Sequence, residues 1–272
     1  MRKLMEYKII AGRTVEIKRS YLSVRPGEKR KRGTRKAGSS SLKKIRANEM
    51  NAARELARLI NMNFPAGSGF VSLKYDNARL PEDFEAAKAF AEKYVRKLRR
   101  AYRRETGHNP KLILVNANWS PRRQAPARLH HHLILPADGI ELARRLWPGG
   151  GFSLECLDSR ADHSALAEYL IENLHGMPNE KHWHPSRNLD KPIYTEPVPV
   201  DDIEGVKAEK ESVIKEHRVS TDEEGHVTGA YLRCVLPEAP RVRGGQIFLT
   251  RRKRREREPE RDYLKGIRDA DE

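Results

Sequence analysis

Three consecutive histidines, His130, His131 and His132, lie in a stretch whose residues favour a β-strand. The stretch runs from residue 128 to residue 135, is rich in aliphatic residues and is closed by Pro136. Because strand side chains alternate between faces, His130 and His132 share one face and His131 lies on the other. Two neutral imidazoles at that spacing can hold one metal ion. The alternative is that the triplet is incidental, on a solvated strand.

A metal ion between two imidazoles needs an oxygen donor to complete a useful face. Asn116 and Asn118 share one face of a second strand, which we predict over residues 112 to 118. Either amide oxygen could approach the ion. Alternatively, both asparagines are polar groups at an edge or a turn.

Tyr169 is the third candidate, on a helix that we predict over residues 165 to 174. Its neighbours one turn away include Ala165, Glu172 and Asn173, and small and polar neighbours leave a tyrosine hydroxyl accessible. A metal ion that polarises a phosphate would make that hydroxyl a competent nucleophile towards a DNA phosphodiester. The alternative is a core tyrosine on an amphipathic helix.

The elements around these residues follow a recognisable order. Residues 6 to 22 predict a β-hairpin, and a helix ends near Asn61. Strands at 69 to 76, 112 to 118, 128 to 135 and 152 to 157 alternate with helices at 81 to 106 and 139 to 147. This predicts an α+β fold, a ferredoxin-like (split βαβ) antiparallel sheet with the helices on one face. The histidine strand and the Phe70 strand would be central, with His130 and His132 on the open face.

We predict four parts along the chain. These are an N-terminal hairpin, basic loop and helix packing on the core (1–66), a nuclease-like core (67–178), a C-terminal extension (179–240) and a basic charged tail (241–272). Within the extension, a short helix over 205 to 216 and a strand over 227 to 236 are expected.

The charge balance favours a polyanionic partner. The chain has 54 Lys and Arg against 38 Asp and Glu, a formal charge of +16 over 272 residues, and nucleic acid is the first expectation. The basic run over residues 25 to 44 is either a solvated linker or a phosphate-contacting arm. Arg100 and Arg103, in the last turns of the helix over 81 to 106, either complement the helix dipole or contact a nucleic-acid backbone. Lys74 is a further expected DNA contact.

Other global features exclude several classes of protein. The two cysteines, Cys156 and Cys234, are far apart and predict a reducing compartment without a disulfide framework. No stretch approaches the ~20 apolar residues of a membrane span, and the first residues lack the apolar run of a signal peptide. We therefore expect a cytoplasmic protein without a membrane partner.

The ordered set of motifs resembles the rolling-circle replication-associated (Rep) proteins, which are HUH endonucleases of bacterial plasmids, phages and integrated elements. The resemblance covers roughly residues 6 to 236. It rests on the strand Phe70 to Asp76, the His-x-His strand, the Tyr-Leu helix and the Ser-Arg-Asn-Leu-x-x-Pro segment that begins at Ser186.

The resemblance implies Mg²⁺ or Mn²⁺ on His130 and His132, with an amide ligand near Asn116. It implies that Tyr169 nicks and rejoins single-stranded origin DNA and stays joined to its 5′ phosphate meanwhile. Arg187 would be either a phosphate contact or a structural bridge to a carboxylate. No GxxxxGK sequence followed by Ser or Thr is present, so host helicase and polymerase are expected partners.

One departure is Glu172, where relatives often carry Lys. Lys would steady a phosphate and Glu would repel it, so Glu172 reflects either drift with reduced activity or activation of water in a later step. Two other hypotheses stay open: a nucleic-acid-binding module without catalysis, and a structural zinc protein. The zinc hypothesis would draw on several histidines, namely His130, His132, His163, His175, His182 or His184.

Overall fold

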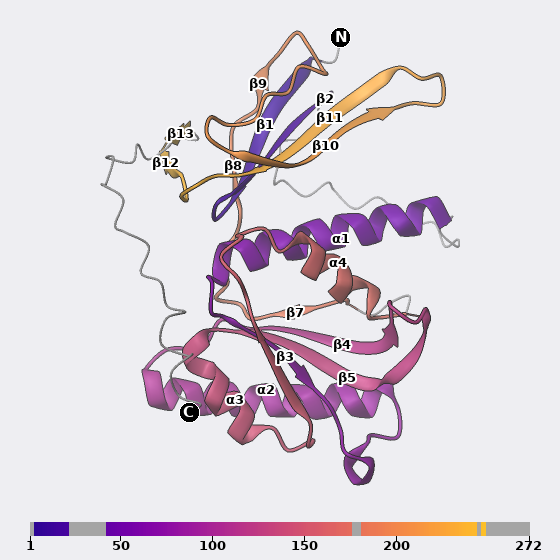
Figure 1. Ribbon diagram of the computed structural model, residues 1–272, viewed down its shortest axis with the longest axis vertical. Helices are drawn as coiled ribbons and strands as arrows, with labels where there is room; N and C mark the ends of the chain where they lie inside the picture. The colour runs from indigo at the N-terminus through magenta and orange to yellow at the C-terminus, as the bar shows by residue number, and fades with distance from the viewer. Residues whose placement is uncertain (1–2, 22–41, 176–180, 244–245, 249–272) are drawn as a thin grey trace, which may run out of the picture.

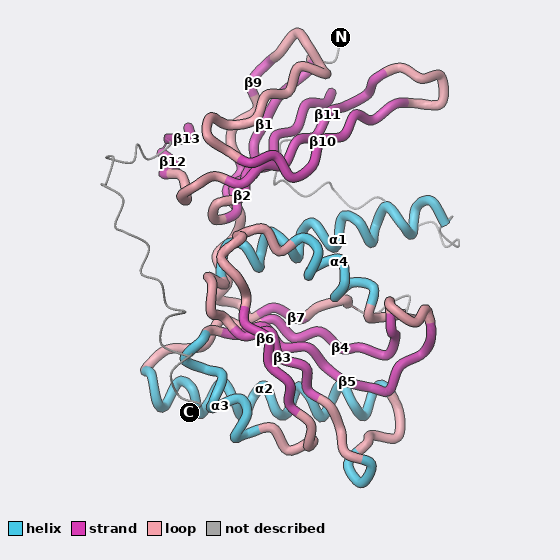
Figure 2. Tube along the Cα trace, viewed as in Figure 1, coloured by secondary structure: helices cyan, strands magenta, loops and turns pink. Residues whose placement is uncertain are grey.

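The computed structural model describes residues 3–21, 42–175, 181–243 and 246–248, and it shows a mixed α+β protein with two large antiparallel sheets (Figures 1 and 2). Helix α1 (Leu42–Asn63) lies between these sheets. The basic run predicted over 25 to 44 and the tail predicted over 241 to 272 lie mostly outside the described residues. In the described part, none of the helices has the length and apolar character needed to cross a membrane.

The first sheet carries the histidine strand at its centre. Its strand order is β6-β3-β5-β4-β7, and all pairings are antiparallel. The strands are β3 (Gly69–Leu73), β4 (Ile113–Ser120), β5 (Ala125–Leu135), β6 (Phe152–Cys156) and β7 (His184–Pro185). The predicted internal positions of the Phe70 strand and the histidine strand, β3 and β5, are confirmed.

Helices cover both faces of this sheet. On one face α2 (Phe84–Thr106) and α3 (Ile140–Leu146) pack on Leu73, Leu133 and Leu135. On the other face α1 and α4 (Ser164–Glu172) pack on Phe70 and Ile134, and Figure 1 shows these two helices on the opposite side of the sheet from α2 and α3. The expectation that the helices lie on one face is therefore wrong. The strands carry apolar residues in both alternating sets, and a sheet that is apolar on both faces must be covered on both.

Local signals set the ends of α2. The carboxylate of Asp83 accepts a hydrogen bond from the Ala86 N–H at 2.8 Å, so the helix begins three residues after Pro81, where we expected its first turn. Gly107, with φ of 81°, ends it by donating its N–H to the Arg103 carbonyl.

The second sheet joins the two ends of the described chain. Its order is β10-β11-β2-β1-β8, and β9 also pairs with β1. The strands are β1 (Leu4–Ala11), β2 (Thr14–Tyr21), β8 (Ile193–Tyr194), β9 (Val198–Pro199), β10 (Val213–Thr221) and β11 (Val227–Val235). A small hairpin of β12 (Arg241–Arg243) and β13 (Gln246–Phe248) follows.

This sheet confirms two predictions and corrects a third. The N-terminal hairpin and the strand near 227 to 236 are present as β1, β2 and β11. The helix expected over 205 to 216 is wrong, because Val213 and Ile214 begin β10 and β-branched residues favour a strand. The boundary between a 1–66 unit and a 179–240 extension does not follow the sheets, since β2 pairs directly with β11.

A buried ion pair joins α1 to the second sheet. Arg58 of α1 donates from Nε and Nη2 to the two carboxylate oxygens of Glu16 on β2, at 2.6 and 2.7 Å. Burial would raise the pKa of Glu16, but the hydrogen bonds and charge of Arg58 outweigh it and lower that pKa. Glu16 therefore stays ionised beneath the helix.

Candidate active site

His130 and His132 lie side by side on the face of β5 that α4 covers. Their ring centroids are 4.9 Å apart, and the rings are nearly perpendicular. His130 Nδ1–H donates to the Arg128 carbonyl at 2.8 Å, and His132 Nδ1 shares a 3.1 Å hydrogen bond with Ser72 Oγ on β3. Both contacts occupy Nδ1. The Nε2 atom of His132 is buried and has no hydrogen-bond partner in the described chain.

The surroundings keep both rings neutral. Burial lowers the pKa of His132 to about 3, and the charges of His130 and Lys74 act in the same direction, while the Asn173 amide partly opposes them. Burial also lowers the pKa of His130. The Arg128 carbonyl can only accept, so His130 carries its proton on Nδ1 and presents a lone pair on Nε2, which is the form that binds a metal ion. His132 takes the same form when its Nδ1–H donates to Ser72 Oγ.

Tyr169 on α4 lies against His132. The two ring centroids are 5.6 Å apart with the rings at 65°, and 39% of Tyr169 remains exposed. The predicted candidates Tyr169, His130 and His132 are therefore together. Asn173, one turn along and 1% exposed, donates from Nδ2 to the Tyr169 carbonyl and fixes this end of the helix.

Asn116 does not join this group. Its amide oxygen accepts from His131 Nδ1–H at 2.8 Å, and the Tyr75 hydroxyl donates to His131 Nε2 at 2.7 Å. The β4–β5 register sets Asn116 opposite His131, so both point to the α2 face. The expectation that Asn116 is a metal ligand is therefore corrected, because it lies on the other face of the sheet from His130 and His132. Burial lowers the pKa of His131 to about 3, so this ring is a neutral member of the core.

Asn118 also has a structural role. Its side chain donates from Nδ2 to the His175 carbonyl and accepts the His175 N–H through Oδ1, each at 2.9 Å. The backbone N–H groups of Asn118 and Trp119 both donate to the Asn173 carbonyl at 3.0 Å. The end of β4 thus holds the C-terminal end of α4, the helix that carries Tyr169.

The basic candidates are divided between different surfaces. Lys74 is exposed beside the site, and its charge lowers the pKa values of both site histidines. Arg100 and Arg103 are exposed on α2, which packs on the opposite face of the sheet from the histidine pair, and their predicted contact with a nucleic-acid backbone stays a prediction. Arg187 is exposed just after β7, and the neighbouring Ser186 bonds to Leu112 before the start of β4.

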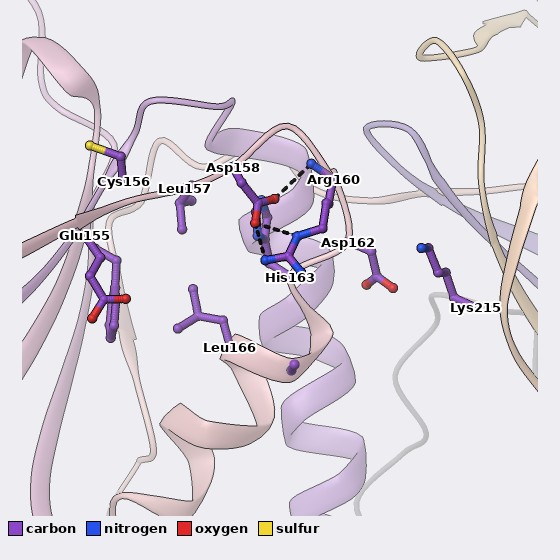
Figure 3. A pocket seen from close by; sticks show the side chains of 11 residues that line it. Glu155, Cys156, Leu157, Asp158, Arg160, Asp162, His163, Leu166 and Lys215 are labelled. Carbon is purple, nitrogen blue, oxygen red and sulfur yellow. Dashed lines mark hydrogen bonds and ion pairs between the residues drawn. The ribbon is translucent and has the colours of Figure 1, made fainter. Parts of the chain in front are cut away.

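A pocket of about 290 Å³, lined by both charged and apolar residues, opens next to the site (Figure 3). Phe70 forms part of its wall and also stacks on His132, with centroids 5.2 Å apart. Leu166 comes from the turn of α4 before Tyr169, and Lys215 comes from the second sheet. Arg160 and Asp158, which both line it and are largely exposed, form an ion pair. The pocket therefore continues the site towards the N-terminal end of α4.

The donor set fits a two-imidazole metal site. The fit rests on the orphaned, buried Nε2 of His132 and on the Nδ1 contact that leaves Nε2 of His130 as the available nitrogen. Within the described ranges, no group of three or more His, Cys, Asp or Glu side chains is placed to hold a metal ion. Of the other histidines considered for zinc, His163 lines the pocket and His175 stacks on Trp119.

Sequence reasoning missed three side chains that shape the site: Phe70, Ser72 and Asn173. Phe70 and Ser72 share one face of β3 with Lys74. Because β3 and β5 were both predicted at the centre of the sheet, alternation along β3 could have predicted that these side chains lie beside the histidine pair. Asn173 is at i+4 from Tyr169, where a side chain faces its helical neighbour. The contact of its carbonyl with β4 could not be predicted, because it depends on the path of the chain after α4, which periodicity does not reveal.

Glu172 is exposed at the last position of α4. A carboxylate there opposes the approach of a phosphate to Tyr169.

Comparisons of the chain with family models, with curated proteins and with solved structures found no match in any of the three.

Proposed function

We propose that this chain is an HUH-type, metal-dependent nickase and strand transferase that acts on single-stranded origin DNA and initiates rolling-circle replication. The observation that carries the proposal is the placement of Tyr169 against His132, beside His130, with the buried Nε2 of His132 making no hydrogen bond within the described chain. A partly exposed tyrosine whose ring packs against one of two neutral imidazoles suits the transfer of a phosphodiester to tyrosine.

The fold supports the proposal. The order β6-β3-β5-β4, with α2 between β3 and β4 and α3 between β5 and β6, is the order expected of a ferredoxin-like split βαβ unit. Its two connecting helices lie on one face. The other face carries the histidine pair, and α4 delivers the tyrosine to it.

In the proposed reaction, the Tyr169 hydroxyl oxygen attacks the phosphorus of a phosphodiester. A bond from the tyrosine oxygen to phosphorus forms, the bond to the 3′ oxygen breaks, and the proton lost by the tyrosine is balanced by the one gained by the 3′ hydroxyl. Attack by a 3′ hydroxyl on the phosphotyrosine reverses the step and rejoins a strand. Mg²⁺ or Mn²⁺ held by His130 and His132 would polarise a phosphate oxygen.

The test is a covalent-adduct assay with labelled single-stranded DNA carrying candidate origin hairpins, with Mn²⁺, Mg²⁺ or EDTA. We expect a metal-dependent adduct on denaturing gels that Tyr169→Phe and His132→Ala abolish. Tyr21→Phe and His226→Ala, which change exposed residues of the second sheet and its β10–β11 turn, are matched controls and should keep it. An adduct that survives Tyr169→Phe would exclude this tyrosine as the nucleophile.

Glu172 favours a second candidate, a nucleic-acid-binding protein derived from such a nuclease and without catalysis. Its carboxylate lies one turn after Tyr169, where it repels phosphate. A large gain in adduct with Glu172→Lys would indicate a nuclease with reduced activity. Unchanged adduct formation with slower turnover would assign Glu172 to water activation. DNA binding with no adduct in either form would favour the non-catalytic candidate.

A further inference from the structure

Trp119 and His175 form a stacked pair at the C-terminal end of α4. Their ring centroids are 4.4 Å apart and the rings are inclined by 25°. Trp119 is half-buried at the end of β4, and His175 is exposed. The pair therefore places two aromatic rings from residues distant in sequence at the surface of the protein.

This pair is tied to the residue proposed as the nucleophile. The Trp119 N–H donates to the Asn173 carbonyl, and the Asn173 side chain donates to the Tyr169 carbonyl. Asn118 holds the backbone of His175 on both sides. The stack thus has a fixed position beyond the C-terminal end of α4, at the opposite end of that helix from the pocket.

Positive charge lies next to the stack. Arg122 and Arg123 are exposed in the turn between β4 and β5, directly after the strand that ends with Trp119 and Ser120. Neither guanidinium makes an ion pair with any described residue. Aromatic rings beside unpaired cations are the combination with which proteins hold single-stranded nucleic acid, through base stacking and phosphate contact.

We infer that the Trp119–His175 pair is a stacking platform for a base of single-stranded DNA close to the phosphate that Tyr169 attacks. Arg122 and Arg123 contact the backbone of the same strand. The inference rests on the proposed function and extends it, since it names residues that bind the strand without taking part in the chemistry. Stacking tolerates any base, so the platform supplies affinity and position rather than sequence preference.

The test compares two labelled oligonucleotides of equal length, one of thymidines and one of abasic residues, with binding followed by fluorescence anisotropy in EDTA. The two oligonucleotides carry the same backbone charge, and only the thymidine strand has bases. We expect Trp119→Ala to weaken binding of the thymidine strand roughly 5- to 100-fold and to leave the abasic strand nearly unchanged. Trp119→Phe should keep most of the affinity. The paired change Arg122→Gln and Arg123→Gln should weaken both strands and flatten the salt dependence.

The control is Tyr21→Ala, which removes an exposed aromatic ring of the second sheet and should leave both affinities unchanged. Equal weakening of both strands by Trp119→Ala would show that the stack only supports α4, and it would overturn the platform. Unchanged binding by Trp119→Ala, with adduct formation intact in the wild type, would overturn the platform alone. Failure of the wild type to bind either strand would overturn the proposed function together with the platform.

Discussion

At the scale of single residues, the Nδ1 contacts decide what the histidine pair can bind. His130 Nδ1–H is held by the Arg128 carbonyl and His132 Nδ1 by Ser72, so each ring is oriented with Nε2 as the available nitrogen. A hydrogen-bonded partner of this kind orients a ligand ring and raises its affinity for metal. Ser72 therefore belongs to the site although it does not bind the ion itself.

We expect Ser72→Ala to raise the Mn²⁺ concentration for half-maximal adduct formation about 10- to 100-fold, because the His132 ring loses its fixed orientation. A metal titration of adduct yield measures this. Ser153→Ala is the matched control, since Ser153 lies opposite Ser72 on β6 and is exposed. Equal metal requirements in the two variants would contradict the assigned role of Ser72.

Alternation along a strand predicted the common face of His130 and His132, and helix geometry predicted an accessible Tyr169. Whether Asn116 lies beside the His130–His132 pair could not be predicted in the same way. Whether Asn116 faces His130 or His131 depends on the register between β4 and β5, and alternation within one strand leaves that open. The irregular register between Ala117 and Trp119 then changes the relation of Asn118 to the sheet.

At the scale of elements, α4 depends on β4 for its position. The helix has nine residues, and the two residues that anchor the chain just after it, Asn173 and His175, are held by the N–H groups of β4 and by the Asn118 side chain. So short a helix has little stability of its own and is held by its packing and by these contacts. The placement of Tyr169 is therefore a property of the helix and strand together.

We expect Asn118→Ala to loosen α4 while the sheet stays folded. Two hydrogen bonds are lost, at a cost of about 1–3 kcal/mol. Hydrogen exchange should show faster exchange of the α4 amides, with slower adduct formation and unchanged protection of β5. Asn188→Ala removes a comparable side-chain bond, to the Asn109 carbonyl on the exposed surface, and should change neither. A loss of protection throughout β5 would show that Asn118 supports the sheet and not α4.

Some of the helices and strands could be predicted from the sequence, and others could not. The order of β3, α2, β4, β5, α3, β6 and α4 follows from periodicity and from caps such as Asp83 and Gly107. The helices on both faces of the histidine sheet, and the whole second sheet, could not be predicted in this way, because they depend on contacts between segments that are distant in sequence. Ile9 with Tyr194, and Ser20 with Gly229, are examples that local pattern cannot reveal.

At the scale of the whole molecule, the Glu16–Arg58 pair fixes the second sheet to the layer that carries the site. Glu16 is 4% exposed and Arg58 8% exposed, and their contact is bidentate. Removing one member of a buried pair leaves an uncompensated charge, whereas replacing both by apolar residues does not.

We expect Arg58→Ala to lower the free energy of unfolding by about 3–5 kcal/mol, and Glu16→Leu with Arg58→Leu to recover most of that loss. The pKa of Glu16 is lowered from 4.5 by Arg58 against burial, so the contribution of the pair is present above pH 4.5 and is lost as the pH falls through the folded-state pKa. Denaturant unfolding at neutral and acid pH should show the wild type and Arg58→Ala converging in acid. A gap independent of pH would contradict ionisation of Glu16 as the cause.

The pairing of β2 with β11 has a consequence for synthesis on the ribosome. β1 and β2 are made before the histidine sheet, but the strand that covers β2 ends at Val235, after that whole sheet has been made. Until then the hairpin leaves an edge of backbone N–H and C=O groups unpaired, and an unpaired edge can pair with another chain. The early-made strands of this sheet are thus covered last. Nascent chains on neighbouring ribosomes of one mRNA would therefore expose these unpaired hairpin edges to one another.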